Sequence, residues 1–224
     1  MLIEVTDLIK YQQQRIKKWL MNRNLFYEIS SDYFYYAEVI VMKDLKFSIP
    51  CPICGDEMQQ PYEAPFDYMI KGKRIPDLQW TINGYYLVSP QVEKAFIENE
   101  VTGVDFYSNV TCLKWLDRKD RIIKGKLPDF KYMTVTSKCG HSILCNGRSL
   151  PRCSNCGLLD PSVKNIITLR TAFDIDLWDG SDIFSFDNST IMFCTEKVKK
   201  IVEANKFKNF EFKTQRGVRC KRED

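Results

Sequence analysis

The chain has 224 residues, of which 44% are hydrophobic and 13% are aromatic, and its formal net charge is +4. A chain of this length and composition can bury one sizeable core, which excludes disorder as its main state. Its longest apolar runs, such as residues 191–194, are far shorter than the roughly 20 residues that cross a bilayer. The N-terminal segment also lacks the apolar run of a secretory signal, so the sequence predicts a cytoplasmic protein without a membrane span.

Positive charge is concentrated at the C-terminal end. Residues 196–224 contain 10 Lys/Arg and 5 Asp/Glu, so the rest of the chain is close to neutral. The last residues, 216–224, form a basic tail that has no aromatic side chains between its charges and ends in two acids. This composition favours a solvated tail over an arm that contacts phosphates, and we do not expect a nucleic acid partner.

The start of the chain is predicted to be helical. Residues 4–20 place apolar side chains among polar ones at roughly helical spacing, with Thr6 in the position of an N-cap. This pattern predicts a helical extension over residues 1–24. Residues 25–29 and 33–41 follow, and their aromatic and β-branched side chains favour strands.

A pattern of strand, helix and strand occurs twice further along the chain. Residues 87–106 (LVSPQVEKAFIENEVTGVDF) align without a gap on residues 193–212 (FCTEKVKKIVEANKFKNFEF), at a constant offset of 106. Each copy has an N-cap candidate, Ser89 or Thr195, followed by apolar residues at helical spacing and then by alternation typical of a strand. The alternative to duplication is chance similarity between two amphipathic helices.

These patterns predict an α+β fold, in which zinc-ribbon-like knuckles are joined to a duplicated strand-helix-strand unit. A helical extension over residues 1–24 precedes a zinc-knuckle module over residues 25–160. The first strand-helix-strand unit, at about residues 77–107, is inserted in that module. The second unit covers residues 161–215, and the basic tail covers residues 216–224.

Four of the nine cysteines lie in two CxxCG motifs, CPICG and CSNCG. A two-residue spacer brings two thiolates within reach of one zinc ion, and the glycine that follows permits a tight turn. Together the motifs supply the four thiolates of a tetrahedral site: Cys51, Cys54, Cys153 and Cys156. Because protein ligands fill every position of such a site, we expect a structural zinc rather than a catalytic one.

Two other uses of the cysteines remain open. Cys139, His141 and Cys145 are alternative ligands in combination with the second motif, because this segment is locally rich in metal-binding side chains. A redox dithiol is a further interpretation of CxxC, although the chain lacks the βαβ context of a thioredoxin. His141 is the only histidine, and without a matched nucleophile, base and orienting group we expect the chain not to be an enzyme.

This combination of motifs resembles the double-CxxCG motif immunity proteins of bacterial polymorphic-toxin systems. The residues that carry the resemblance are the two CxxCG motifs and the segments VSPQVEKAFIENEVTGVDF and CTEKVKKIVEANKFKNFEF, all within residues 24–215. The resemblance implies a protein that binds its cognate toxin tightly and neutralises it by protein–protein contact. The added group of Cys139, His141 and Cys145 departs from the family pattern, so it leaves the zinc pairing open.

A nucleic-acid-binding zinc ribbon is the alternative function. Its motivation is the pair of CxxCG motifs together with the basic C-terminal segment. Such a protein would bind DNA or RNA with a strong dependence on salt concentration. An immunity protein would instead bind the product of a neighbouring gene tightly and stoichiometrically, and it would not bind DNA.

Overall fold

The computed structural model describes residues 26–31, 38–41, 48–55, 57–59, 66–81, 86–140, 142–144, 147, 149–158, 160, 171–186, 189, 191–215 and 217–218. The helices within these residues are α2 (Pro90–Glu98) and α3 (Glu196–Asn205). The strands are β1 (Phe26–Ser30), β2 (Glu38–Val41), β3 (Ser48–Pro50), β4 (Glu57–Gln59), β5 (Phe66–Lys71), β6 (Leu78–Trp80), β7 (Tyr86–Val88), β8 (Val104–Tyr107), β9 (Val110–Leu116), β10 (Lys131–Val135), β11 (Ser142–Leu144), β12 (Thr171–Asp174), β13 (Ile183–Ser185), β14 (Met192–Thr195), β15 (Glu211–Gln215) and β16 (Gly217–Val218). The helix predicted near the N-terminus and most of the basic tail lie outside this part of the chain.

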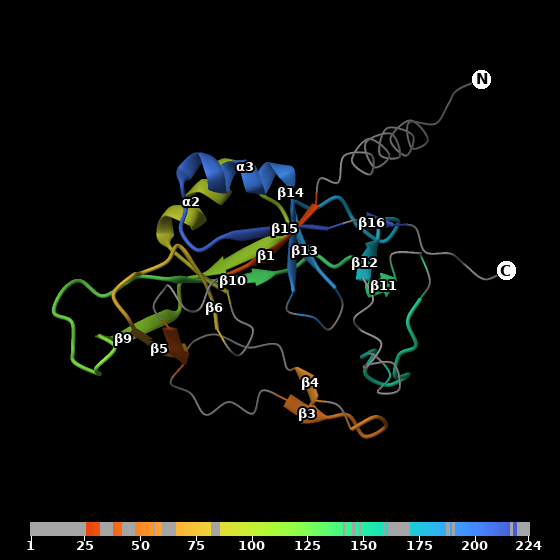
Figure 1. Ribbon diagram of the computed structural model, residues 1–224, viewed down its shortest axis with the longest axis horizontal. Coiled ribbons are helices and arrows are strands. Elements are labelled where there is room, and N and C mark those ends of the chain that lie inside the picture. The colour runs from red at the N-terminus through yellow and green to blue at the C-terminus, as the bar shows by residue number, and fades with distance from the viewer. Residues whose placement is uncertain are drawn as a thin grey trace.

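Two four-stranded antiparallel sheets form the centre of the molecule (Figure 1). One has the strand order β6-β7-β10-β8, and the other has the order β13-β14-β1-β15. In each sheet a helix connects two strands that run in the same direction, and a third strand lies between them in the opposite direction. The unit β7-α2-β8 is therefore arranged around β10 as the unit β14-α3-β15 is arranged around β1.

The two helices pack side by side and cover one core that both sheets share (Figure 1). An amphipathic helix is stable in water only when its apolar stripe is buried, and here each stripe faces the same cluster. The buried members of this cluster are Ile29, Leu78, Tyr86, Val88, Val92, Ala95, Phe96, Met133, Ile183, Met192, Cys194, Val198, Ile201 and Val202. The two units thus bury their apolar surface together.

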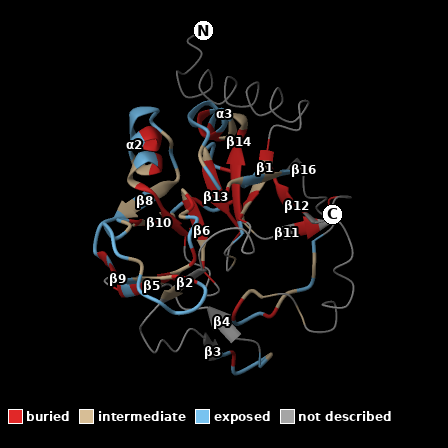
Figure 2. Ribbon diagram, turned by 60° about the vertical axis from the view of Figure 1, so that its left-hand side comes forward, coloured by how far each residue is buried: buried red, intermediate tan, exposed pale blue. Residues whose placement is uncertain are grey.

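The opposite faces of both sheets are also buried (Figure 2). In β7, Tyr86 and Val88 belong to the shared core, whereas Leu87 packs against residues of β5 and β9. In β14, Phe193 lies in an aromatic cluster on the side away from the helices, together with Phe26 of β1. Successive side chains of a strand point to opposite faces, so strands covered on both sides need apolar residues at every position.

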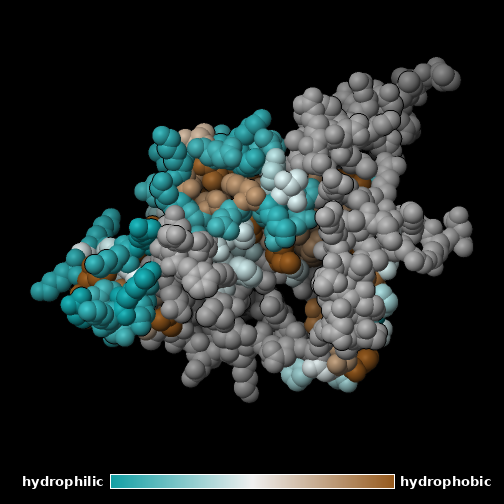
Figure 3. Space-filling model, in the orientation of Figure 1, coloured by the Kyte–Doolittle hydropathy of each residue, from teal (hydrophilic) through white to brown (hydrophobic). Residues whose placement is uncertain are grey.

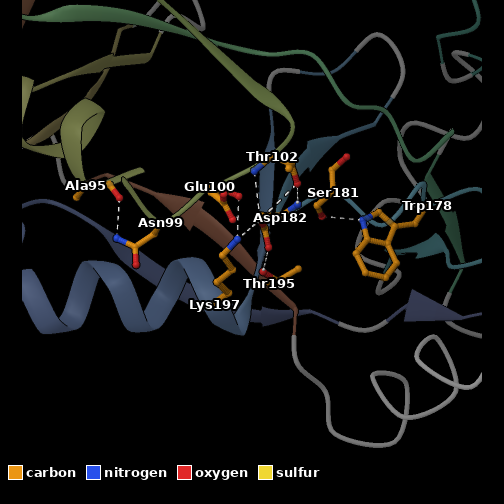
Figure 4. Close-up of polar contacts among 9 residues, drawn as sticks. All are labelled: Ala95, Asn99, Glu100, Thr102, Trp178, Ser181, Asp182, Thr195 and Lys197. Carbon is orange, nitrogen blue, oxygen red and sulfur yellow. Dashed lines mark hydrogen bonds and ion pairs between the residues drawn. The ribbon is translucent and has the colours of Figure 1, made fainter. Parts of the chain in front are cut away.

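Asp182 joins the start of α3 to the loop that follows α2 (Figure 4). Its Oδ1 accepts a hydrogen bond from the Thr195 hydroxyl at 3.1 Å, and its Oδ2 accepts one from the Thr102 backbone N–H at 3.2 Å. The Lys197 ammonium lies 2.8 Å from the same Oδ2. The Ile183 N–H donates to the Thr102 carbonyl at 3.0 Å. One carboxylate therefore ties the N-terminus of α3 to the other unit.

Asp77 makes the corresponding contacts in the first unit. Its Oδ1 accepts a hydrogen bond from the Ser89 hydroxyl at 2.7 Å, and its Oδ2 accepts one from the Lys208 backbone N–H at 2.7 Å. The Leu78 N–H donates to the Lys208 carbonyl at 3.3 Å. Ser89 and Thr195 occupy the predicted N-cap positions, yet each hydroxyl bonds to an aspartate and neither side chain caps a helix N–H. Each unit thus supplies an aspartate whose carboxylate accepts a hydrogen bond from a backbone N–H of the other unit.

The predicted α+β class agrees with this arrangement of sheets and helices. The segment predicted as a strand at residues 25–29 forms β1, which pairs with β14 and β15 near the other end of the chain. Of the strand predicted over residues 33–41, the last part forms β2, and residues 32–37 lie outside the described part of the chain. The division of the chain at residues 160 and 161 stays a prediction.

A tight hairpin follows β9, and Asp117 organises its turn. The Oδ1 of Asp117 accepts hydrogen bonds from the backbone N–H groups of Lys119 at 2.8 Å and Arg121 at 3.0 Å, and its Oδ2 lies 2.7 Å from the Arg121 guanidinium. Backbone hydrogen bonds from Asp117 to Arg121 and from Ile123 to Trp115, each 2.8 Å long, close the hairpin. Hydrogen bonds to the carboxylate, above all from the Arg121 side chain, lower the pKa of Asp117 to about 2.

The close contact between the two units can be tested at Gly103. Its φ is +87°, and a Cβ at this position would overlap the Ile183 carbonyl oxygen. Gly180 is a matched control, because its φ is +99° but a Cβ there would meet nothing within 4 Å. In urea denaturation, Gly103→Ala should lower the free energy of unfolding by about 3 kcal/mol or more, and Gly180→Ala by roughly 1 kcal/mol. Equal losses would contradict the close packing.

The Asp117 turn predicts a dependence on pH. Because the folded-state pKa, about 2, lies below the ordinary value of 3.8, the carboxylate stabilises the hairpin above about pH 4. This stabilisation is lost as the pH falls toward about 2. The protection of the amides at residues 117–123 against hydrogen exchange, measured relative to the intrinsic exchange rate at each pH, should therefore fall over that range more than the protection of the core strands. In Asp117→Asn this protection should already be lower at neutral pH, and acid should reduce it less. If the protection of these amides in the wild type did not change with acid, this role of Asp117 would be refuted.

Candidate metal centre

The first CxxCG motif forms the turn of the β3-β4 hairpin. These strands pair in antiparallel register with Pro50 opposite Glu57, and the motif occupies the connection between them. The Gly55 N–H donates to the Cys51 carbonyl at 2.9 Å, and the φ of Gly55 is +73°. Because glycine adopts this left-handed conformation at no steric cost, the chain can close a tight turn directly behind the two cysteines.

The second CxxCG motif repeats this geometry. The Gly157 N–H donates to the Cys153 carbonyl at 2.9 Å, and the φ of Gly157 is +69°. The Cys153 N–H donates to the Leu158 carbonyl at 2.9 Å, and the Arg152 guanidinium donates to the Gly157 carbonyl at 3.0 Å. The two turns thus have an equivalent backbone hydrogen bond and the same glycine conformation.

The four motif cysteines meet at one point. Their sulfur atoms all lie within 4.8 Å of one another, although the motifs are 102 positions apart in the chain. The Sγ atoms of Cys51 and Cys153 are 3.8 Å apart, and those of Cys54 and Cys156 are 3.6 Å apart. A tetrahedral metal with bonds of about 2.3 Å holds its sulfurs about 3.8 Å apart, whereas a disulfide bond is only about 2.0 Å long. All four are free thiols, and their spacing fits a metal ion.

The motif backbones favour thiolates at the first cysteine of each pair. The N–H of Cys54 is the largest of the contacts that lower the pKa of Cys51 to about 6. The N–H groups of Cys156 and Asn155 lower the pKa of Cys153 in the same manner, whereas burial raises the pKa of Cys156. Metals bind cysteine in its thiolate form, so these N–H groups prepare the site for a cation.

Asn155 was not among the residues that the motif spacing singled out. Its Nδ2 donates to the Cys51 sulfur at 3.4 Å, so this side chain reaches from the second motif to the first. Asn155 occupies one of the two variable positions of CSNCG. The only sequence signal for this contact is a polar amide beside a cysteine ligand. The contact itself could not be predicted, because it depends on how the two motifs are oriented in the fold.

The structure separates the alternative ligand Cys139 from the four motif cysteines. The Cys139 thiol is fully buried and donates to the Ser185 carbonyl at 3.4 Å, within the aromatic cluster that contains Phe173 and Trp178. The other two alternative ligands, His141 and Cys145, lie outside the described residues. Among the residues that can be compared, the group that could hold a metal consists of the four predicted cysteines.

Substitution of one motif cysteine should release the metal. Cys51→Ser is expected to lower the metal content, measured by inductively coupled plasma mass spectrometry, from about one equivalent to near zero, and to lower the Tm by several degrees or more. Cys112→Ser is the matched control, because Cys112 is a buried thiol of β9 outside the group. Cys139→Ser should likewise retain the metal. Loss of metal from Cys139→Ser but not from Cys51→Ser would assign the site to the alternative ligands.

Comparisons with known proteins add no family to this geometry. Neither a scan against protein-family models nor a search of curated proteins finds a match to the chain. Among the described helices, neither α2 nor α3 has the length and apolar character needed to span a membrane.

Proposed function

We propose that this chain is a cytoplasmic immunity protein, which binds a cognate bacterial toxin and neutralises it by protein–protein contact. One observation carries the proposal: two CxxCG motifs with adjoining sulfurs occur together with two strand-helix-strand units of the same topology. That combination is the basis of the resemblance to the double-CxxCG motif immunity proteins. The proposal gives the chain no catalytic step, because its inhibitory action needs only shape and charge complementary to the toxin.

The proposed metal is zinc, and its role is structural. Thiolates are soft ligands, and a group of four at tetrahedral spacing suits zinc best among the common metals of a reducing cytoplasm. Four protein ligands leave no coordination position for water or substrate, so such a zinc supports the fold rather than a reaction. Cys51, Cys54, Cys153 and Cys156 would each supply one thiolate.

The free energy of zinc binding is large enough for the metal to hold the fold together. Joining two points about 100 residues apart in an unfolded chain costs roughly 5 kcal/mol of chain entropy. Structural zinc sites in small peptides bind with about 10 kcal/mol or more, which exceeds that cost. The apolar support is small, because the cluster around the thiols contains only the four cysteines and Leu158 among the described residues. Metal bonds, rather than hydrophobic burial, would therefore hold the two motifs together.

The two strand-helix-strand units are proposed to descend from a duplicated unit. Three observations support this origin: the strand orders match, Asp77 and Asp182 make corresponding contacts, and left-handed backbone recurs 106 positions apart. The left-handed pairs are Glu100 with Lys206 and Gly103 with Asn209. Chance similarity between two helices would not require matching loops after the helices. The central strands differ in their place in the sequence, because β10 follows the unit β7-α2-β8 whereas β1 precedes the unit β14-α3-β15.

The immunity proposal is tested by binding. The purified chain, loaded with zinc, should bind the product of the gene immediately upstream in a one-to-one complex with a Kd of about 10 nM or tighter, measured by isothermal titration calorimetry at two salt concentrations. A random DNA duplex serves as the control ligand. Because an inhibitor recognises the folded partner, heat-denatured partner should give no binding isotherm.

Two outcomes would count against the proposal. The chain could leave the neighbouring gene product unbound, in which case the immunity function fails. It could also bind the DNA duplex with an affinity that falls steeply with salt, which is the behaviour of the nucleic-acid-binding alternative.

A further inference from the structure

A basic surface lies at the end of the β5-β9 pair, outside the metal centre. It consists of residues 113–127, which comprise the end of β9 and the hairpin turn that follows it, and the adjoining residues 71–74. Together they contain nine Lys/Arg and two Asp/Glu, a net charge of +7, whereas the entire chain has a net charge of +4. We call these two segments the basic hairpin. The remainder of the chain is therefore slightly acidic in balance, and this positive charge is local.

The two segments of the basic hairpin are fixed to each other. The Lys71 ammonium lies 2.7 Å from the Asp120 carboxylate. The Gly72 N–H donates to the Leu116 carbonyl at 2.8 Å, and the Trp115 indole N–H donates to the Gly72 carbonyl at 2.7 Å. With the Asp117 turn, these contacts hold the surface in one arrangement before any partner binds. A surface that is ordered in advance loses less entropy on association.

Most basic side chains of the basic hairpin face solvent. Its two acids form ion pairs with basic residues of the same surface, namely Lys71 and Arg121. The other seven basic side chains are all exposed: Lys73, Arg74, Lys114, Arg118, Lys119, Lys124 and Lys126. The hairpin projects at the far end of the molecule from β12 and β16, and its hydrophilic side chains dominate that end of the surface (Figures 1 and 3). A partner can therefore reach these charges without steric obstruction by the described elements.

Apolar side chains are exposed among these charges. Ile122 is 70% exposed at the hairpin, Leu113 is 45% exposed and Leu127 is 39% exposed. An isolated exposed leucine needs no explanation, but three aliphatic side chains on one short, ordered hairpin resemble the apolar centre and charged rim of a protein interface. Hydrophobic patches of this kind within the charged surface also appear in Figure 3.

We propose that the basic hairpin is the contact surface for the toxin, and that it binds an acidic face of that protein. This inference rests on the proposed immunity function and names the face that performs it. Complementary charge would accelerate association, and the aliphatic side chains would supply area that is buried on binding.

A protein partner suits the basic hairpin better than a nucleic acid. Single-stranded nucleic acid binding combines basic residues with exposed aromatic rings on which bases stack. The exposed apolar side chains of this surface are aliphatic, and its one tryptophan, Trp115, is half-buried with its indole N–H bonded to Gly72. The hairpin thus offers charge and aliphatic surface but no exposed stacking platform among its residues.

The test reverses charge in two places with the same change in net charge. The hairpin variant carries Lys119→Glu, Lys124→Glu and Lys126→Glu. The control variant carries Lys94→Glu, Lys200→Glu and Lys208→Glu, at exposed positions on and after the two helices. A third variant, Ile122→Ser, removes the most exposed apolar side chain of the hairpin. Circular dichroism and thermal unfolding verify that each variant is folded before its affinity for the upstream gene product is measured.

The hairpin variant should bind about tenfold or more weakly, mainly through a slower association rate that depends less on salt. The control variant should stay within about threefold of the wild type, and Ile122→Ser should mainly accelerate dissociation. Equal affinities for the hairpin and control variants would overturn the assignment of the surface and leave the immunity function standing. Absence of binding by the wild type would overturn both proposals. DNA binding that only the hairpin variant loses would assign the surface to nucleic acid and contradict a protein partner.

Discussion

The architecture depends on the burial of both faces of the two central sheets. One face of each sheet lies under the paired helices α2 and α3, and the other packs against a smaller sheet or an aromatic cluster. Each large apolar side chain buried in this way contributes roughly 1.5 to 3 kcal/mol. Because the core under the helices is continuous across both sheets, neither unit has a complete core of its own.

The aspartates immediately before β6 and β13 define how the two units are oriented to each other. Hydrophobic burial is not directional, so it brings the units together without defining their exact orientation. Asp77 and Asp182 each bind the hydroxyl before a helix and a backbone N–H of the other unit. These charge-assisted hydrogen bonds are directional and define the orientation in which the shared core can form.

The metal centre and the basic hairpin lie outside that core. The thiol group has little apolar surface around it, and the hairpin is held by the Asp117 turn and contacts to β5. Polar contacts hold the hairpin, and metal–thiolate bonds would hold the metal centre. Binding surfaces that lie at the edges of a rigid scaffold commonly have this arrangement. The metal would stabilise one edge, and the hairpin would offer the other for binding.

Local signals explain which parts of this structure could be predicted from the sequence. The helices after Ser89 and Thr195 have apolar residues at helical spacing, although the two hydroxyls bond to aspartates instead of capping a helix N–H. The four cysteines have a motif whose spacing follows from metal geometry. Pairing of β1 with β14 and β15 joins residues more than 160 positions apart, and no local pattern encodes that choice. The basic hairpin has no such local signal, because its charge averages out over a long, nearly neutral segment of the chain. Only the pairing of β5 with β9 brings residues 71–74 and 113–127 together.

We propose that one metal ion joins two motifs 102 positions apart through four thiolates. X-ray absorption at the metal edge of the purified protein measures the number, type and distance of the ligands directly. We expect a zinc edge with four sulfur neighbours at about 2.3 Å and no lighter ligand. A nitrogen or oxygen neighbour at about 2.0 Å, or protein that is fully folded with no metal bound, would contradict it.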